Sequence, residues 1–423
     1  MLSRLSACWE TWFLEERPSL SVSLFRMALA AAVGLHVFPT LLQMRDNYLG
    51  SAFREYNPSF FPIPVLIWAD KSPDWLIWAA AWLFALSWLA FFLGLWTQKS
   101  GILMTLCAYY FYARNSLHIG TLSWDIMLVT VFLMLVTAYP GDSFSLDSVL
   151  KGDPDCFRRR RPFFLQRLLQ LQIASTYFYT GLCKWTGEGN WLTQNPYYYL
   201  MHNPPTGVMK DFPWRAFLGN HPDFCYLLGI ACLLCEMSLP LWLFWPRTRP
   251  LAVAAGCAFQ AYLLLTMHVP TIFFFLFPPQ LLLFVDPEKL LAWIERRRAL
   301  RARRGRDRLV FDGDCGFCRG AMARVMALDP AGRIEPVDFR GKNPSTIDPR
   351  LTQEACQARI HLIEPGGRIS AGFDAFRRLS LRLPLLWPAA PVLNFPGIKR
   401  VGVPLYDWIA RMRFHLSVKL GAR

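Results

Sequence analysis

Two cysteines near the C-terminal end carry the clearest chemical signal of this 423-residue chain. Cys315 and Cys318 stand in the run Phe311-Asp312-Gly313-Asp314-Cys315-Gly316-Phe317-Cys318, between a predicted strand and a predicted helix. Two cysteines with this spacing at a strand-to-helix turn are typical of a redox site. The free N–H groups and the dipole at the start of a helix favour a thiolate at Cys315, and Cys318 follows one turn later. We therefore predict that Cys315 attacks a disulfide and that Cys318 resolves the mixed disulfide.

Two neighbouring features bear on this prediction. A C-x-x-C pair is also half of a zinc site, but only one further cysteine and two poorly spaced histidines follow it. We therefore expect a redox pair and no bound metal. Asp312 and Asp314 flank the turn, and negative charge close to a thiol raises its pKa. If these carboxylates face Cys315, the pair is a modest reductant rather than a strong oxidant.

The run Val310–Cys318, followed by Gly372-Phe373-Asp374-Ala375-Phe376 and a basic C-terminal helix, resembles the DCC family of thiol-disulfide oxidoreductases. The resemblance covers about residues 306–420 and implies a thioredoxin-like fold in which Asp312, Gly313 and Asp314 support the cysteines. Thioredoxins have a cis-proline before their third strand, whereas this chain has Gln357-Ala358-Arg359 there. We therefore do not expect a standard thioredoxin substrate groove.

The pattern of apolar residues and turns around the pair predicts a small α/β domain. Strands are predicted at 308–311 and 333–339, a hairpin at 359–371 around Glu364-Pro365-Gly366-Gly367, and helices at 318–328, 373–383 and 407–414.

A lysine at the end of an apolar segment is the second candidate for chemistry. Lys184 lies in the run Tyr177-Phe178-Tyr179-Thr180-Gly181-Leu182-Cys183-Lys184-Trp185. Such a lysine commonly extends its ammonium group to the membrane interface. A lysine held inside the bilayer costs about 2.5–3.5 kcal/mol on insertion scales and needs a functional reason. Desolvation would lower its pKa and make it a usable base, so the residues alone leave both interpretations open.

The spacing Tyr177-Phe178-x-x-Gly181-Leu182-x-Lys184, together with Ser145-Leu146-Asp147, is similar to the HTTM family of vitamin K-dependent gamma-carboxylase-like proteins. The resemblance covers about residues 20–290. It implies that Lys184 matches the second lysine of the carboxylase active-site pair, whose first position is Cys183 here. His118 is out of register with the active-site histidine of that family. The resemblance also implies a vitamin K-like quinone as a cofactor, although no cofactor is assigned from the residues themselves.

One acid and a second cysteine pair share the apolar segment 224–245. Glu236 is a functional candidate, because acids inside membrane helices are costly, although a structural hydrogen bond to a neighbouring helix explains it equally well. Cys232 and Cys235 form another C-x-x-C, but cysteines in apolar helices behave as small hydrophobic residues. We keep Glu236 as a supporting residue and assign no redox chemistry to this second pair.

The composition indicates an integral membrane protein. Hydrophobic residues make up 54% of the chain and charged residues 18%, whereas soluble domains have about 25% charged residues. Because a span needs about 20 apolar residues, we predict about eight spans. These lie at residues 22–43, 75–96, 101–113, 125–139, 164–183, 224–245, 251–268 and 271–285.

The basic residues predict the orientation in the membrane. With a cytosolic N-terminus, the cytosolic segments carry 19 Lys and Arg and the outer segments carry seven. Both termini are then cytosolic, and we expect the inner membrane of a bacterium. The basic runs at 158–161 and 296–308 follow apolar segments, so we assign them to the membrane flank and expect no nucleic acid partner.

The predicted fold is thus a polytopic α-helical membrane protein with a C-terminal α/β thioredoxin-like domain. Its parts are an interfacial leader at 1–20, an HTTM-like domain at 21–286, a basic linker at 287–307 and a DCC-type domain at 308–423. The predicted function is dithiol exchange by Cys315 and Cys318 with an unknown thiol or disulfide protein, coupled to a membrane domain that handles a quinone or modifies a peptide. The alternative is a non-catalytic scaffold or transporter for exported peptides, with the soluble domain as a binding module.

Overall fold

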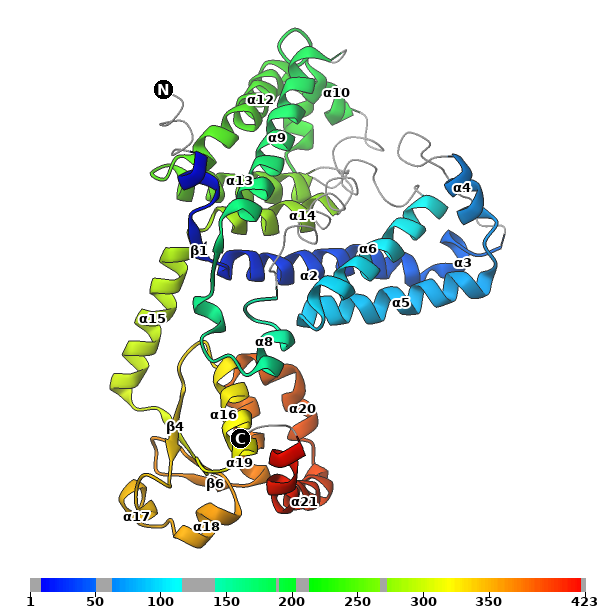
Figure 1. Cartoon of the computed structure of the whole chain (residues 1–423). Coiled ribbons are helices and arrows are strands. Elements are labelled where there is room, and N and C mark those ends of the chain that lie inside the picture. Colours follow the sequence, from blue (N-terminus) through cyan, green and yellow to red (C-terminus); the bar gives the residue numbers. More distant parts are fainter. Residues whose placement is uncertain are drawn as a thin grey trace. The chain divides into compact units, whose positions relative to one another are not determined.

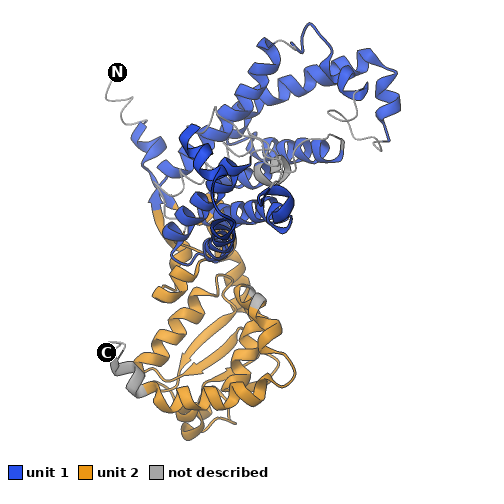
Figure 2. Cartoon of the chain, turned by 90° about the vertical axis from the view of Figure 1, so that its right-hand side faces the viewer, with its two compact units in different colours: residues 1–17, 21–140, 161–286 blue, residues 18–20, 141–160, 287–423 orange. Residues whose placement is uncertain are grey.

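The structure, a computed structural model of the whole chain, describes residues 9–50, 63–115, 141–187, 190–202, 213–266 and 272–419. The chain forms two compact units (Figure 2). Unit 1 consists of residues 1–17, 21–140 and 161–286, and unit 2 of residues 18–20, 141–160 and 287–423. The predicted span at 125–139 and His118 lie outside the described residues.

Unit 1 is a bundle of helices, as its apolar composition predicts (Figure 1). Its longer helices are α2 (Leu20–Leu42), α5 (Asp74–Leu93), α6 (Thr97–Arg114), α9 (Phe164–Thr186), α12 (Pro222–Phe244), α13 (Arg249–Thr266) and α14 (Ile272–Leu281). Its short helices are α3 (Met44–Asn47), α4 (Ile63–Asp70), α10 (Pro196–His202) and α11 (Arg215–Gly219), and the 3-10 turn η2 (Leu282–Phe284) follows α14. Glycine and proline mark some of the helix ends. Gly94, with a φ of 71°, is the C-cap residue of α5, and α12 begins at Pro222.

Three helices of the described residues are long and apolar enough to cross a membrane. They are α2, α5 and α12, and the shorter apolar stretch Arg249–Leu265 lies in α13. The prediction of about eight spans is therefore not confirmed. Seven of the eight predicted segments coincide with described helices, but α6 and α9 contain charged and amide side chains, and α14 has only 10 residues. Gln166 and Gln170 of α9 face protein, since both donate to the carbonyl of Leu283.

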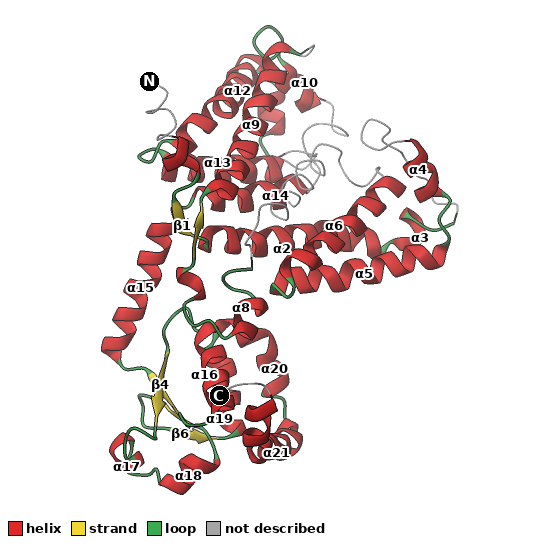
Figure 3. Cartoon of the chain, in the orientation of Figure 1, coloured by secondary structure: helices red, strands yellow, loops and turns green. Residues whose placement is uncertain are grey.

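Unit 2 holds a four-stranded sheet with helices on both faces (Figure 3). The strands β3 (Asp307–Phe311), β4 (Ile334–Asp338), β5 (His361–Ile363) and β6 (Ile369–Ala371) have the order β4-β3-β5-β6. β3 is parallel to β4 and antiparallel to β5, and β5 and β6 form the predicted hairpin. The main helices are α15 (Pro287–Arg304), α16 (Gly316–Ala327), α19 (Phe373–Arg382) and α21 (Ile398–Lys419). Shorter elements are α17 (Pro344–Ile347), α18 (Gln353–Ala358), η3 (Pro384–Ala389) and α20 (Ala390–Leu393).

Alternate residues of β3 build two hydrophobic cores, one on each face of the sheet. Leu309 is buried with residues of α16 and α19, whereas its neighbour Val310 is buried with residues of the α17–α18 side. This alternation follows from the two-residue period of a strand. A sheet covered on both faces holds the end of β3, and with it the start of α16, in a defined position.

The predicted strands, the hairpin and the helices at α16 and α19 are confirmed, and α15 occupies most of the predicted basic linker. The last helix was predicted at 407–414 but runs from Ile398 to Lys419. The sequence did not predict α17, α18 and α20, which have four to six residues each. Helices this short depend on single capping residues, such as Thr352, whose Oγ1 accepts from the N–H of Ala355 at 3.2 Å.

Residues 141–160 belong to unit 2, although they are far from its other residues in the sequence. This segment contains α8 (Leu146–Lys151) and η1 (Cys156–Arg158). Phe157 is buried in one cluster with Ile294 of α15, and a Cβ on Gly152 would lie 3.3 Å from Ala323 of α16. Arg158 also pairs with Glu295 at 3.0 Å. The segment therefore packs on both α15 and the helix that carries Cys318.

Candidate active site

Cys315 caps the N-terminus of α16. Its Sγ accepts a hydrogen bond from the backbone N–H of Cys318 at 3.3 Å, and Cys318 lies in the first turn of the helix. A thiolate at Cys315 would gain from this N–H and from the positive end of the helix dipole. The structure therefore brings the two predicted cysteines together, and both are free thiols.

Both cysteines are buried: Cys315 is 1% exposed and Cys318 is 8% exposed. Burial is the main reason that the pKa of Cys318 rises to about 12, and its hydrogen bond with Cys315 adds to the rise. Cys318 is therefore a neutral thiol at neutral pH. Since so little of Cys315 is exposed, a protein disulfide reaches its sulfur only after neighbouring side chains move.

The raised pKa of Cys318 predicts how its alkylation depends on pH. In an unfolded chain the thiol ionises near pH 8.5, whereas in the folded chain it ionises near pH 12. The thiol therefore keeps its proton to a higher pH in the folded chain than in the unfolded chain. The stability that this pKa difference contributes is complete below about pH 8.5 and declines as the pH rises towards 12. We expect the iodoacetamide labelling rate of native Cys318 to keep rising up to pH 11, as measured by mass spectrometry. The same cysteine in denaturant should level off above about pH 8.5, and a plateau below pH 9 in the native protein would contradict the prediction.

The carboxylates of Asp312 and Asp314 both lie close to the guanidinium group of Arg340, so neither is an isolated charge beside the thiols. Asp312 is 2% exposed, and Arg340 binds both of its oxygens, with Nε–Oδ1 at 2.8 Å and Nη2–Oδ2 at 3.0 Å. This hydrogen-bonded pair lowers the pKa of Asp312. The side chain of Asp314 is 76% exposed and lies 3.4 Å from Arg340. Asp312 still contributes to the raised pKa of Cys318, but as the last of its causes.

Gly313 allows the turn to pass close to Asp338 at the end of β4. Its N–H donates to Asp338 Oδ1 at 2.9 Å, and the same oxygen accepts from the N–H of Arg340 at 2.9 Å. A Cβ on Gly313 would lie 1.9 Å from Asp338 Oδ2, so any other residue type would have to displace the side chain of Asp338. Asp338 thereby links the turn before Cys315 to the neighbouring strand.

Replacement of Gly313 by alanine is expected to destabilise unit 2 by about 1–3 kcal/mol, the usual cost of overpacking. The added methyl group would displace Asp338 and break its hydrogen bond to the turn. Thermal unfolding of the purified protein measures the effect. Gly341→Ala is the matched control, because nothing lies within 4 Å of a Cβ at that position. Equal stability of the two variants would contradict the prediction.

Helix α21 and the residues before β5 border the cysteines. Arg413 and Tyr406 of α21 are close enough for electrostatic interaction with Cys318, and Arg413 partly offsets the rise in its pKa. Tyr406 Oη accepts from the N–H of Ile360 at 3.1 Å, and Arg413 donates to the carbonyl of Gln357. α21 therefore holds the segment in which thioredoxins have their cis-proline.

Lys184 and Glu236 form an ion pair inside unit 1. Lys184 Nζ donates to Glu236 Oε2, although the residues are 52 positions apart in the chain. Their helices, α9 and α12, lie side by side, and a Cβ on Gly181 would lie 2.6 Å from Met237 (Figure 1). The side chain of Glu236 is 8% exposed and that of Lys184 is 25% exposed. The lysine also lies 5.5 Å from the centre of the Trp191 ring, a cation–π contact.

Other buried polar groups of unit 1 could bind a polar ligand. Gln260 Nε2 donates to Tyr177 Oη at 3.1 Å, and the Oε1 atom of Gln260 has no partner among the described residues. Both amide atoms of Gln280 are buried without a hydrogen bond to the described residues. The amide nitrogen of Gln280 is an unpaired donor and could donate to a carbonyl oxygen of a ligand, whereas Gln260 Oε1 would need a ligand that donates. Within the described ranges no group of three or more His, Cys, Asp or Glu is placed to hold a metal ion.

Four residues at the thiol site were not predicted from the sequence: Asp338, Arg340, Tyr406 and Arg413. The parallel pairing of Phe311 with Asp338 explains the first two, because it places the ends of β3 and β4 next to each other. The sequence does contain a pattern that could have indicated these two residues. The strand that follows the cysteine motif ends at an aspartate, and an arginine stands two residues later. No local pattern marks Tyr406 or Arg413.

Comparisons with known proteins find two families in the chain. A family model described as an HTTM domain matches residues 16–288, and one described as a DCC1-like thiol-disulfide oxidoreductase matches residues 309–419. The uncharacterized protein At5g50100, chloroplastic, of Arabidopsis thaliana is 28% identical over 112 residues, which are 26% of this chain and 52% of that protein. The chain thus covers about half of this relative, and no solved structure matches. The chain belongs to the HTTM family and carries a DCC1-like thiol-disulfide oxidoreductase domain after its HTTM domain.

Proposed function

We propose that the protein is a membrane-bound thiol-disulfide oxidoreductase in which Cys315 is the attacking thiol and Cys318 the resolving thiol. The observation that carries the proposal is the hydrogen bond from the N–H of Cys318 to Cys315 Sγ at the start of α16. The N–H of Cys318 and the positive end of the helix dipole point to Cys315 Sγ, whereas burial raises the pKa of Cys318 and keeps it protonated. A thioredoxin-like fold is supported by the parallel β3–β4 pair and by the antiparallel hairpin β5–β6.

The exchange proceeds in two balanced steps. The Cys315 thiolate attacks one sulfur of a substrate disulfide, a mixed disulfide forms, and the other substrate sulfur leaves as a thiolate. Cys318 then loses its proton and attacks Cys315 Sγ, which forms the Cys315–Cys318 disulfide and releases the second substrate thiol. The substrate gains two electrons and the cysteine pair loses two, so an external reductant must restore the dithiol.

The membrane domain is proposed to supply an electron partner. The reduced form of a quinone, when bound, would supply the two electrons and two protons that restore the dithiol, and added quinone would run the same couple in reverse by oxidising the dithiol. The hydroxyl of Tyr177 and the amide nitrogens of Gln260 and Gln280 could donate to its oxygens. Lys184, paired with Glu236, would hold or move a proton at its Nζ. If the purified protein shows no quinone-dependent oxidation of the dithiol, this coupling is wrong. We further propose that the protein has about eight spans, that both of its termini are cytosolic, and that it lies in the inner membrane of a bacterium.

A second function is supported by one observation, the 1% exposure of Cys315. A buried thiol suits a binding module of a membrane scaffold or transporter better than it suits an exchange enzyme. Such a scaffold would assist the maturation of exported peptides without using the cysteines.

A trapping experiment on native membranes separates the two functions. In Cys318→Ser the mixed disulfide at Cys315 cannot be resolved, so we expect covalent partners to accumulate and to be identified by mass spectrometry. Cys315→Ser should trap none, and Cys356→Ser is the matched control, because Cys356 is a third buried cysteine of the same domain. If no adduct forms and a Cys315→Ser, Cys318→Ser double variant keeps full activity in cells, the scaffold function stands.

A further inference from the structure

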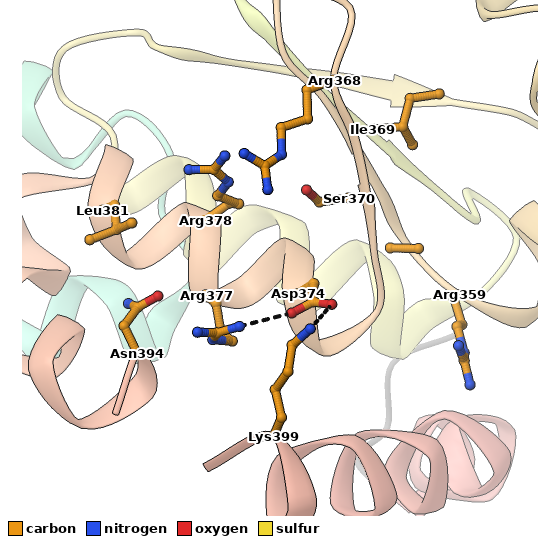
Figure 4. A pocket seen from close by; sticks show the side chains of 11 residues that line it. Arg359, Arg368, Ile369, Ser370, Asp374, Arg377, Arg378, Leu381, Asn394 and Lys399 are labelled. Carbon is orange, nitrogen blue, oxygen red and sulfur yellow. Dashed lines mark hydrogen bonds and ion pairs between the residues drawn. The ribbon is translucent and has the colours of Figure 1, made fainter. Parts of the chain in front are cut away.

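A basic pocket lies at the free edge of the sheet, in unit 2. β6 is the last strand in the order β4-β3-β5-β6, and the pocket lies between it, α19 and the residues around α20 and α21 (Figure 4). Its volume is about 510 Å³, within the range of about 300–1,000 Å³ for small-molecule sites. The lining contains five cationic side chains and one carboxylate: Arg359, Arg368, Arg377, Arg378, Lys399 and Asp374.

The single carboxylate positions two of the cations. Asp374 Oδ2 lies 2.8 Å from Lys399 Nζ, and Asp374 Oδ1 lies 3.1 Å from Arg377 Nη1 (Figure 4). Arg377 is held further by its Nε, which donates to the carbonyl of Leu393 at 3.0 Å. Both cations are thus ordered before a ligand arrives, which reduces the entropy that binding would cost.

Two polar side chains of the lining have no partner among the described residues. Arg368 is exposed and makes no ion pair with the described residues, and the Ser370 hydroxyl, in a residue 8% exposed, makes no hydrogen bond with them. Figure 4 shows these two side chains and that of Arg378 turned towards the same part of the pocket. Arg378 is only partly satisfied, by Glu364 at 3.3 Å.

Cations in excess of carboxylates, with a free guanidinium and a free hydroxyl, are the groups that bind a phosphate. Arginine donates two parallel N–H bonds to such an anion, and a serine hydroxyl adds a third donor. Only Leu381, Ile369 and Ala371 are apolar in the lining, so a mainly apolar ligand is disfavoured. We propose that this pocket binds a phosphate monoester, carried either by a small soluble metabolite or by a lipid headgroup.

Equilibrium binding to the full chain in zwitterionic phosphatidylcholine nanodiscs tests the proposal, with radiolabelled glycerol 3-phosphate as the probe. We expect saturable binding that inorganic phosphate displaces. Arg368→Gln should weaken it about tenfold or more, and Ser370→Ala several-fold, as for hydrogen bonds to charged groups. Neither replaced side chain has a partner in the described protein, so both variants should fold. Arg400→Gln is the matched control, because it removes one positive charge beside Lys399 but does not line the pocket.

Nanodiscs that contain phosphatidic acid distinguish the two sources of the phosphate. If the lipid is the ligand, they exclude the soluble probe and raise the melting temperature of the wild type but not of Arg368→Gln. If a metabolite is the ligand, the lipid has no effect on probe binding. Binding should persist in the Cys315→Ser, Cys318→Ser double variant, so the result is independent of the proposed redox function. The proposal is overturned if neither phosphate source binds, if succinate competes as well as phosphate, or if Arg400→Gln loses as much affinity as Arg368→Gln.

Discussion

Replacement of Lys184 by methionine is expected to destabilise the helical unit by about 3 kcal/mol, because it leaves the Glu236 carboxylate buried without its partner. The side chain of Glu236 is 8% exposed, and it lies in α12, which is long and apolar enough to cross a membrane. A charge without a partner in such a place is among the costliest single changes to a membrane protein. Thermal unfolding in detergent measures the loss.

A double-mutant cycle shows whether the ion pair is the cause. Glu236→Leu alone should also destabilise, because the ammonium group then loses its carboxylate, whereas Lys184→Met with Glu236→Leu should recover most of the stability. Lys99→Met is the control for the loss of a lysine, since Lys99 is exposed and has no carboxylate partner among the described residues. Additive losses in the double variant would show that the two side chains act separately, and the proposed proton-holding role of Lys184 would lose its basis.

Replacement of Arg340 by glutamine is expected to have a similarly large effect on unit 2. Asp312 is 2% exposed and relies on two hydrogen bonds from Arg340, so its carboxylate would remain buried and poorly paired. Loss of about 3 kcal/mol is the usual result. Pulsed alkylation of Cys356, which is 2% exposed, reports the opening of this domain by mass spectrometry. Arg324→Gln is the control, because Arg324 is exposed and has no carboxylate partner among the described residues.

The pH dependence of this loss has a definite sign. In the wild type Arg340 holds the pKa of Asp312 below its ordinary value, about 3.9, so the pair stabilises the fold above that pH. This contribution is lost as the pH falls through the lowered pKa of the folded state. In Arg340→Gln the largest cause of the lowered pKa is lost, although the N–H of Asp314 and Arg413 still favour the carboxylate, so the difference from the wild type should be large at pH 7 and should shrink towards pH 3. A difference that does not change between pH 7 and pH 3 would contradict this explanation.

The sequence predicted the placement of the two thiols better than the charges around them. The spacing of Cys315 and Cys318 and the turn between strand and helix are local features, and the predicted cap is confirmed. The sequence left open whether the carboxylates of Asp312 and Asp314 face Cys315, and it gave no partner for Asp312. Its partner, Arg340, comes from the end of another strand, and only the register of the parallel pair β3–β4 brings them together.

The membrane unit was harder to predict for a related reason. Lys184 and Glu236 were each singled out as isolated residues, but neither hydropathy nor periodicity shows that α9 and α12 lie in contact. The register of two packed helices depends on side chains along both of them, such as Gly181 against Met237. Hydropathy also treats every apolar run alike, which explains why eight segments were predicted where three described helices meet the length and composition of a span.

The segment 141–160 also has a consequence for biosynthesis. A ribosome makes this segment more than a hundred residues before it makes α15 and α16, on which it packs. Ile294, which packs in the same cluster as Phe157, is synthesised only in the last third of the protein. Until then the apolar side chain of Phe157 lacks this contact. Assembly of the redox domain is then complete only when synthesis of the membrane part is complete.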